Sequence, residues 1–129
     1  MLYTIKKRSD FVEISKSGNS IAAKGVVVVA MKRKEASSLL SDNKDIIRVG
    51  YTVTKKVGNA VIRNKIKRRF RAIANSLMQE LAMNGYDYIF IARYHSANRT
   101  FSSLEKDITY ALHSLRKNYD KEKTNSKPA

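Results

Sequence analysis

The sequence predicts one α+β domain, an α/β sandwich in which a single sheet of about four strands packs with three helices. Short apolar or alternating segments, typical of strands, are interspersed with amphipathic helical segments. The chain has 129 residues and is 43% hydrophobic, which suits one domain with its own core. Residues 1–117 show no repeat and no break in composition, whereas residues 118–129 are polar and are expected to form a disordered basic tail.

The first third of the chain predicts a short helix and then a strand. Ser9 is a suitable N-cap, Asp10 suits the positive end of the helix, and Gly18 ends it. Residues 26–31 are apolar and mostly β-branched, which predicts a strand whose two faces both meet apolar partners, or one of which is a binding surface. Residues 18–25 either extend that strand or precede it as a loop.

The middle of the chain predicts a loop, a strand and a turn. Residues 35–45 are polar and serine-rich, as expected of a loop. Apolar and small or hydroxyl residues alternate across residues 46–54, which indicates a strand. Gly58 suits a turn, and Asn59 suits the N-cap of the helix that follows.

The clearest element is an amphipathic helix across residues 60–83. Its apolar residues recur every three or four positions, at Ile62, Ile66, Phe70, Ile73, Leu77 and Leu81. Asn84 and Gly85 are expected to end it.

The last third predicts a strand and a second amphipathic helix. Residues 86–93 read as a strand. Ser102 and Glu105 have capping-box spacing, so a helix is expected to begin at Ser102. Its buried stripe is expected to comprise Leu104, Ile108, Leu112 and Leu115.

The charge favours a polyanionic partner. Lys and Arg total 26 against 11 acidic residues, a formal net charge of +15, which opposes compaction unless a polyanion neutralises it. Nucleic acid is the first candidate, an anionic membrane the second and an acidic protein the third. The sequence has no cysteine, no signal-peptide pattern and no apolar run approaching the roughly 20 residues of a membrane span, so we expect a cytoplasmic location.

The helix of residues 60–83 carries a basic face opposite its apolar stripe. At about 100° per residue, Asn64, Lys67, Arg68 and Arg71 lie opposite Ile62, and Arg63, Lys65 and Arg69 flank the stripe. Solvated helix faces usually mix signs, yet residues 46–79 contain nine cations and no acidic residue. Cations near a helix N-terminus also oppose the helix dipole. This face is therefore expected to bind a polyanion. Its apolar side is needed for the core, which argues against a membrane, but composition alone leaves DNA open.

Residues 48–71, RVGYTVTKKVGNAVIRNKIKRRFR, closely resemble the signature of the bacterial ribonuclease P protein components. The matching positions are Lys55, Lys56, Gly58, Asn59, Ala60, Val61, Arg63, Asn64, Lys65, Lys67, Arg68 and Arg71. Lys65 stands where Arg is common, which would remove a bidentate contact. A looser similarity extends from Lys6 to Lys117.

The resemblance implies a fold like the second domain of ribosomal protein S5, with a left-handed βαβ crossover around the basic helix. It implies a subunit that binds the catalytic ribonuclease P RNA and the 5′ leader of precursor tRNA, so that the leader is removed. The expected contacts with the catalytic RNA are Lys55, Lys56, Asn59, Arg63, Asn64, Lys65, Lys67, Arg68 and Arg71. The expected leader contacts are Phe11, Val27, Val29 and Thr52. Val29, and Ser15 one turn after Phe11, stand where family members often have an aromatic residue.

The resemblance also implies that Mg²⁺, bound mainly by the RNA subunit, activates the attacking water, and that the protein contributes neither a catalytic residue nor a metal site. The two histidines, His95 and His113, are then expected to be surface residues. No DNA or membrane partner is expected, and the isolated protein is expected to be monomeric.

Two alternatives remain at this point. A ribosomal or other structured-RNA-binding protein would have the same charge and fold class. A protein-only nuclease would need clustered acidic metal ligands, and the sequence shows no such grouping among Asp42, Asp45, Glu80 and Asp87.

Overall fold

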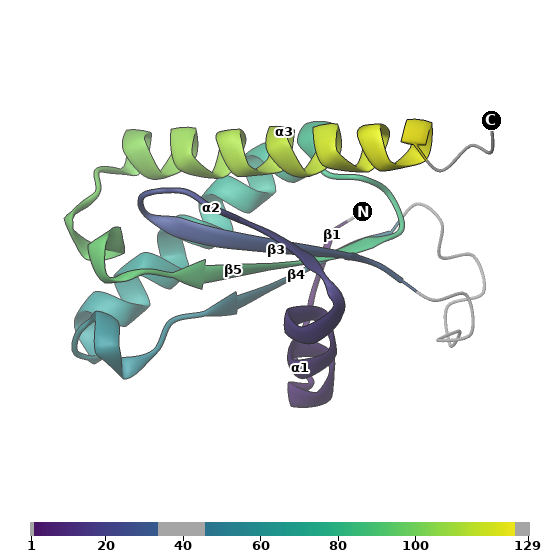
Figure 1. Ribbon diagram of the computed structural model, residues 1–129. Coiled ribbons are helices and arrows are strands. Elements are labelled where there is room, and N and C mark those ends of the chain that lie inside the picture. The colour runs from purple at the N-terminus through teal and green to yellow at the C-terminus, as the bar shows by residue number, and fades with distance from the viewer. Residues whose placement is uncertain (1, 34–45, 126–129) are drawn as a thin grey trace.

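The computed structural model describes residues 2–33 and 46–125, which form one five-stranded sheet with helices on both faces (Figure 1). The strand order is β1-β4-β5-β3-β2. The strands are β1 (Leu2–Thr4), β2 (Asn19–Ala22), β3 (Val26–Lys32), β4 (Ile47–Thr52) and β5 (Tyr86–Ala92). Strands β1, β4 and β5 are parallel, whereas β3 and β2 complete the sheet in antiparallel pairs. The predicted α+β sandwich is confirmed, with one strand more than expected.

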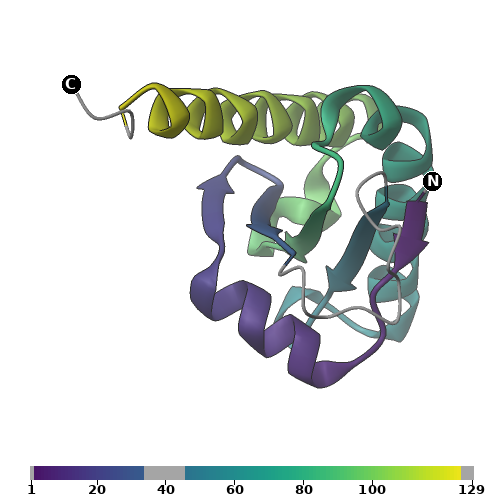
Figure 2. The same ribbon diagram turned by 90° about the vertical axis from the view of Figure 1, so that its right-hand side faces the viewer.

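The helices divide between the two faces of the sheet. Helices α2 (Ala60–Leu81) and α3 (Phe101–Asn125) cover one face, and α1 (Arg8–Ser17) lies on the other (Figures 1 and 2). Helix α2 connects the parallel neighbours β4 and β5, which gives the expected βαβ unit around the basic helix.

The unbroken apolar sequence of β3 is explained by its position in the sheet, where both of its faces are covered. Val26 and Val28 are fully buried in the main core beneath α2 and α3. Val29 packs on the opposite face with Ile14 of α1 and Ile89 of β5. The first of the two sequence-based readings, a strand with two apolar partners, is confirmed.

The short strands β1 and β2 account for the higher strand count. Residues 19–22 pair antiparallel with β3, and the backbone N–H of Ala23 donates to the carbonyl of Val26 at 2.8 Å to close the hairpin. Residues 18–25, for which the sequence allowed either an extension of the next strand or a loop, therefore consist largely of a separate strand, β2. Strand β1 has only three residues, too few for alternation to be recognised in the sequence.

Helix α2 matches its sequence pattern closely. The side chain of Asn59 accepts a hydrogen bond from the backbone N–H of Ile62 at 3.0 Å, so the predicted N-cap is confirmed. Within the stripe, Ile66, Phe70 and Ile73 are fully buried. The ring of Phe70 meets that of Phe90 edge to face, with centroids 5.9 Å apart.

Two predicted N-caps, Ser9 for α1 and Ser102 for α3, are wrong. Helix α1 begins at Arg8 after the extended residue Lys7, so Ser9 lies inside the helix and does not cap it. For α3, Thr100 Oγ1 accepts a hydrogen bond from the backbone N–H of Ser103 at 3.1 Å, and Ser102 therefore lies inside that helix. The predicted stripe of α3 is buried as expected.

Helix α3 also continues past the predicted end of the domain. It runs to Asn125, so the backbone of residues 118–125 is helical where disorder was expected. The ring of Tyr119 meets that of Tyr86 edge to face at 5.6 Å, a contact between residues far apart in the sequence that composition could not reveal. The predicted loop of residues 35–45 and the last four residues lie outside the described residues.

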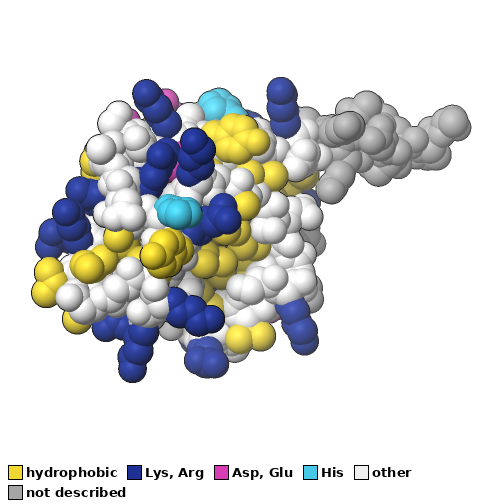
Figure 3. Space-filling model, turned by 60° about the vertical axis from the view of Figure 1, so that its left-hand side comes forward, with side chains coloured by type: hydrophobic (Ala, Val, Ile, Leu, Met, Phe, Trp, Pro, Cys, Tyr) yellow, Lys and Arg dark blue, Asp and Glu magenta, His cyan; other side chains and the backbone are white. Residues whose placement is uncertain are grey.

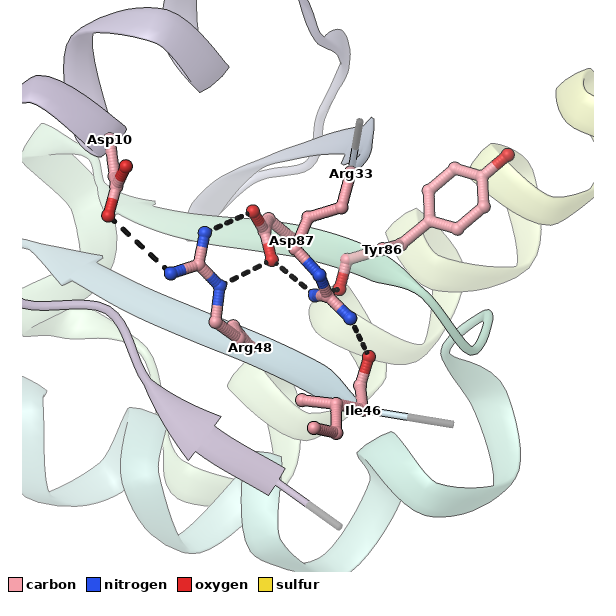
Figure 4. A network of polar contacts seen from close by, with 6 residues as sticks. All are labelled: Asp10, Arg33, Ile46, Arg48, Tyr86 and Asp87. Atoms are coloured by element: carbon pink, nitrogen blue, oxygen red, sulfur yellow. Dashed lines mark hydrogen bonds and ion pairs between the residues drawn. The ribbon is translucent and has the colours of Figure 1, made fainter. Parts of the chain in front are cut away.

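A network of polar contacts ties α1 to the sheet (Figure 4). The carboxylate of Asp87, 1% exposed in β5, accepts hydrogen bonds from Arg48 Nε at 2.8 Å and Arg48 Nη2 at 2.6 Å. Arg33 Nη1 donates to the same carboxylate at 2.6 Å. Arg48 Nη1 also lies 3.5 Å from Asp10 of α1. The hydrogen bond with Asp87 raises the pKa of Arg48, and the contact with Asp10 links α1 to the network.

Candidate nucleic-acid interface

The basic segment begins in a tight turn ahead of α2. A 3-10 helix, η2 (Lys55–Val57), presents the exposed side chains of Lys55 and Lys56. Gly58 follows with φ of 156°, a conformation that favours glycine, and Asn59 then caps the helix. Glycine here lets the chain turn sharply, so that two cations lie immediately before the helix N-terminus.

Most of the predicted contacts with catalytic RNA are on the surface. Arg63 and Lys67 are half-buried, and the exposed ones are Lys55, Lys56, Asn59, Asn64, Lys65, Arg68 and Arg71. None of these cations is paired with a carboxylate among the described residues. Their charge is therefore available to phosphate groups.

Two arginines of α2, Arg69 and the predicted RNA contact Arg71, have contacts within the protein. Arg69 Nη1 donates to the carbonyl of Arg99 at 2.8 Å, which joins α2 to the start of α3. The guanidinium of Arg71 lies 5.9 Å from the ring centroid of Tyr51, within cation–π range. Burial raises the pKa of Tyr51 to about 12, despite the opposing charge of Arg71. Tyr51 is therefore a neutral ring between the basic helix and the sheet.

A groove of about 760 Å³ opens between α1, the end of β4 and the basic helix. Its lining residues are Lys6, Arg8, Phe11, Val12, Ser15, Lys16, Tyr51, Thr52, Val53 and Lys67. Two of the four predicted leader contacts, Phe11 and Thr52, line it. Lys67 of the basic helix forms part of the same groove, so the two predicted surfaces are adjacent.

The position of Phe11 depends on a glycine in β4. A Cβ atom at Gly50 would lie 2.6 Å from Phe11 Cζ, so the ring packs directly on the strand backbone. Phe11 remains half-buried at the groove, and an aromatic ring in that position can stack against a base.

The other two predicted leader contacts lie elsewhere. Val29 is only 4% exposed and belongs to the small core beneath α1, so its side chain is not accessible to RNA in this structure. Val27 is half-buried beside the same core and does not line the groove. An apolar run in the sequence does not distinguish the residues under a helix from those beside it.

Sequence reasoning also missed part of the groove lining. Tyr51 and Val53, on either side of the predicted Thr52, also line the groove at the end of β4. Lys6, Arg8 and Lys16 add charge around Phe11, and none of the described residues that line the groove is acidic. The one available signal was the density of cations on either side of Phe11 in the sequence.

The described residues show no metal-binding cluster. They contain no group of three or more His, Cys, Asp or Glu side chains placed to hold a metal ion. Separately, none of the described helices is both long and apolar enough to cross a membrane.

Comparison with known proteins points to one family. The family model described as Ribonuclease P matches residues 2–116. The ribonuclease P protein component of Gluconacetobacter diazotrophicus is 36% identical over 110 residues, covering 85% of this chain and 88% of that protein. A mutant RNase P protein of Staphylococcus aureus superposes with a TM-score of 0.74 at 34% identity, covering 88% of each chain. The RNase P protein of Thermotoga maritima gives a TM-score of 0.72 at 26% identity, covering 87% of this chain and 96% of that one.

Fold, basic helix, sequence similarity and structural similarity therefore agree, and the chain belongs to the ribonuclease P protein component family.

Proposed function

We propose that this chain is the protein subunit of a cytoplasmic ribonuclease P that removes the 5′ leader of precursor tRNA. The exposed cations of η2 and α2 dock it on the catalytic RNA, and the groove beside Phe11 holds the single-stranded leader. The observation that carries the proposal is the continuity of these surfaces, since Lys67 lies on the basic helix and also lines the groove.

The groove suits a single strand of RNA on chemical grounds. Four cations, Lys6, Arg8, Lys16 and Lys67, can meet successive phosphates, and the described part of the lining has no carboxylate to oppose them. Phe11 and Tyr51 offer aromatic surface to bases without reading their sequence. The basic helix beside this groove is suited to binding structured RNA. The groove itself is therefore suited to the single-stranded leader of a substrate bound by the same complex.

The role of this subunit is binding and orientation. The reaction is hydrolysis of a phosphodiester bond, with Mg²⁺ held mainly by the RNA subunit supplying the activated water. The protein contributes by neutralising phosphates and by holding the leader on one side of the cleavage site. We expect it to act as a monomer, without a DNA or membrane partner.

Reconstitution tests the proposal. The purified protein, the ribonuclease P RNA of the same source and a precursor tRNA are combined at low Mg²⁺, where repulsion between the two RNAs is least screened. The expected result is faster leader removal than by the RNA alone. Absence of stimulation would reject the proposal and favour another structured-RNA-binding role. Cleavage by the protein without the RNA would instead favour a protein-only nuclease.

A further inference from the structure

A second surface, away from the leader groove, exposes aromatic rings beside cations. Strand β5 leads into a 3-10 helix, η3 (Tyr94–Asn98), and then into α3. Tyr94 is 75% exposed, Tyr110 is 60% exposed and Phe101 is 41% exposed. Large aromatic side chains are usually buried, and a local concentration of exposed ones often marks a binding surface.

A pocket of about 520 Å³ lies beside Tyr110 and next to the start of η3, between the β2–β3 turn, the end of β5 and α3. It is lined by Ala22, Ala23, Lys24, Arg93, Arg99, Asp107 and Tyr110. Arg99 forms two hydrogen bonds of 2.9 Å with Asp107, so the only carboxylate in the lining is already neutralised. Lys24 and Arg93 are exposed and leave the pocket with net positive charge.

The backbone around this pocket is firmly held. Ser96 Oγ donates to the carbonyl of Gly25 at 2.6 Å, and Asp107 accepts a hydrogen bond from the backbone N–H of Gly25 at 3.1 Å. Arg93 donates to the carbonyl of Ala23. A ligand would therefore meet a surface whose backbone is already in place, which lowers the entropy cost of binding.

We call Lys24, Arg93, Tyr94, His95 and Tyr110 the aromatic patch. Its element η3 packs against both η2 and α2, the elements that carry the predicted contacts with catalytic RNA. Figure 3 shows hydrophobic and histidine side chains lying among Lys and Arg side chains on one face of the molecule. The ring of His95 lies edge to face with Tyr94 at 5.3 Å.

From this arrangement we propose that the aromatic patch is a further RNA-contacting surface, which stacks unpaired bases on Tyr94 and Tyr110 and holds neighbouring phosphates with Lys24 and Arg93. Exposed rings beside cations that have no carboxylate partner among the described residues match the two parts of an unpaired nucleotide, its base and its phosphate. The identity of the RNA rests on the proposed function. The unpaired nucleotides belong either to the catalytic RNA or to the precursor tRNA.

Two double variants test the stacking. Tyr94→Ala with Tyr110→Ala removes both rings, whereas Tyr94→Phe with Tyr110→Phe keeps them. Tyr3→Ala is the matched control, because Tyr3 is 39% exposed on β1, at the opposite edge of the sheet from β2. Affinity is measured for the ribonuclease P RNA alone, for precursor tRNA by the assembled holoenzyme, and for a short unstructured RNA oligonucleotide. Thermal unfolding verifies that each variant is folded.

The expected result is a loss of roughly 5-fold or more for each ring removed, and so of roughly 30-fold or more on the Ala variant, which lacks both rings. The Phe variant and Tyr3→Ala keep wild-type affinity. A loss for ribonuclease P RNA alone assigns the nucleotides to that RNA, and a loss confined to precursor tRNA assigns them to the substrate. Lys24→Gln should lower the salt dependence of binding by about one counterion, whereas the Ala variant leaves it unchanged.

Wild-type affinity of the folded Ala variant for all three RNAs would overturn the inference. So would a loss on the Phe variant equal to that on the Ala variant, or a wild-type dimer that the Ala variant abolishes while RNA affinity is unchanged. The oligonucleotide arm separates this inference from the proposed function. If wild-type protein fails to bind ribonuclease P RNA, the proposed function fails, and a stacking-dependent loss on the oligonucleotide would still support the patch.

Discussion

The ring of Phe11 on α1 packs against the backbone of Gly50 on β4, so closely that an added Cβ at position 50 would lie 2.6 Å from Cζ and 2.7 Å from Cε1. Such separations are far below van der Waals contact, so only glycine allows the ring to lie there. The depth of the proposed leader groove at this point is therefore set by the absence of a side chain on the sheet.

Gly50→Ala should displace Phe11 and weaken binding of the leader. Because a stacked base is worth about 1–3 kcal/mol, we expect precursor tRNA affinity of the holoenzyme to fall by roughly 5- to 150-fold. Affinity for mature tRNA, which has no leader, should not change. Equilibrium binding of both tRNAs measures this. If the effect acts through Phe11, adding Phe11→Ala to Gly50→Ala should cause little further loss, and simple additivity would argue against that route.

Arg68→Gln should reduce the salt dependence of binding to ribonuclease P RNA. Arg68 is exposed on α2 without a carboxylate partner among the described residues, so a contact with phosphate would release about one counterion. The slope of log K against log salt should therefore become shallower by about one. Lys32→Gln removes an exposed cation at the end of β3 and serves as the control. Equal effects of the two substitutions would indicate general charge attraction instead of a docking site.

Asp87→Asn should destabilise the protein strongly. The buried carboxylate neutralises Arg33 and Arg48, and removal of one partner from a buried ion pair typically costs about 3–5 kcal/mol of unfolding free energy. Asp10→Asn breaks only the partly exposed 3.5 Å contact and should cost less than about 1 kcal/mol. Urea denaturation of both variants provides the comparison. Equal stabilities of the two variants would mean that the buried ion pairs of Asp87 contribute little to the stability of the protein.

Tyr88 should make stability fall at alkaline pH. Burial raises its pKa to about 12, opposed in part by the hydrogen bond that its hydroxyl accepts from the Met83 backbone N–H at 2.8 Å. An unfolded tyrosine loses its proton near pH 10. The neutral buried phenol therefore contributes fully below about pH 10, and on the order of 2–3 kcal/mol is lost as the pH rises to about 12.

Tyr88→Phe separates that titration from the hydrogen bond. At pH 7 the variant should be less stable by about 1–3 kcal/mol, because the buried N–H of Met83 loses its acceptor. Between pH 10 and pH 12 the gap to wild type should narrow, since phenylalanine does not titrate. Denaturation curves across this range measure it. A constant gap would show that Tyr88 does not carry the alkaline sensitivity.

The elements with strong local signals were predictable. Helix α2 has an apolar residue every three or four positions and a capping Asn59, both readable without tertiary contacts. The basic segment was readable because it excludes acidic residues. By contrast, the three-residue strand β1 depends on tertiary contacts, its pairing with β4 and the packing of Leu2 against the core. Towards the end of α3, Tyr119 contacts Tyr86, a residue far away in the sequence.

The groove was only half predictable, because its walls come from separate elements. Phe11 and Thr52 were expected there, but the joining of Lys6, Tyr51 and Lys67 depends on how α1 sits against the end of β4. Val29 illustrates the opposite error, since its burial follows from the position of α1 over β3. Likewise, Asp87 is the centre of a network whose arginines lie 54 and 39 positions away, and local sequence gives no sign of it.

The most direct test of this account is a crossed measurement on two variants, Arg68→Ala on the basic helix and Phe11→Ala in the groove. For each, we would determine the affinity for ribonuclease P RNA and the ratio of precursor to mature tRNA affinity of the assembled holoenzyme. The account predicts that Arg68→Ala weakens RNA assembly and leaves the ratio unchanged, whereas Phe11→Ala lowers the ratio and leaves assembly unchanged. If both variants lost the same function to the same extent, the separation into a docking helix and a leader groove would be contradicted.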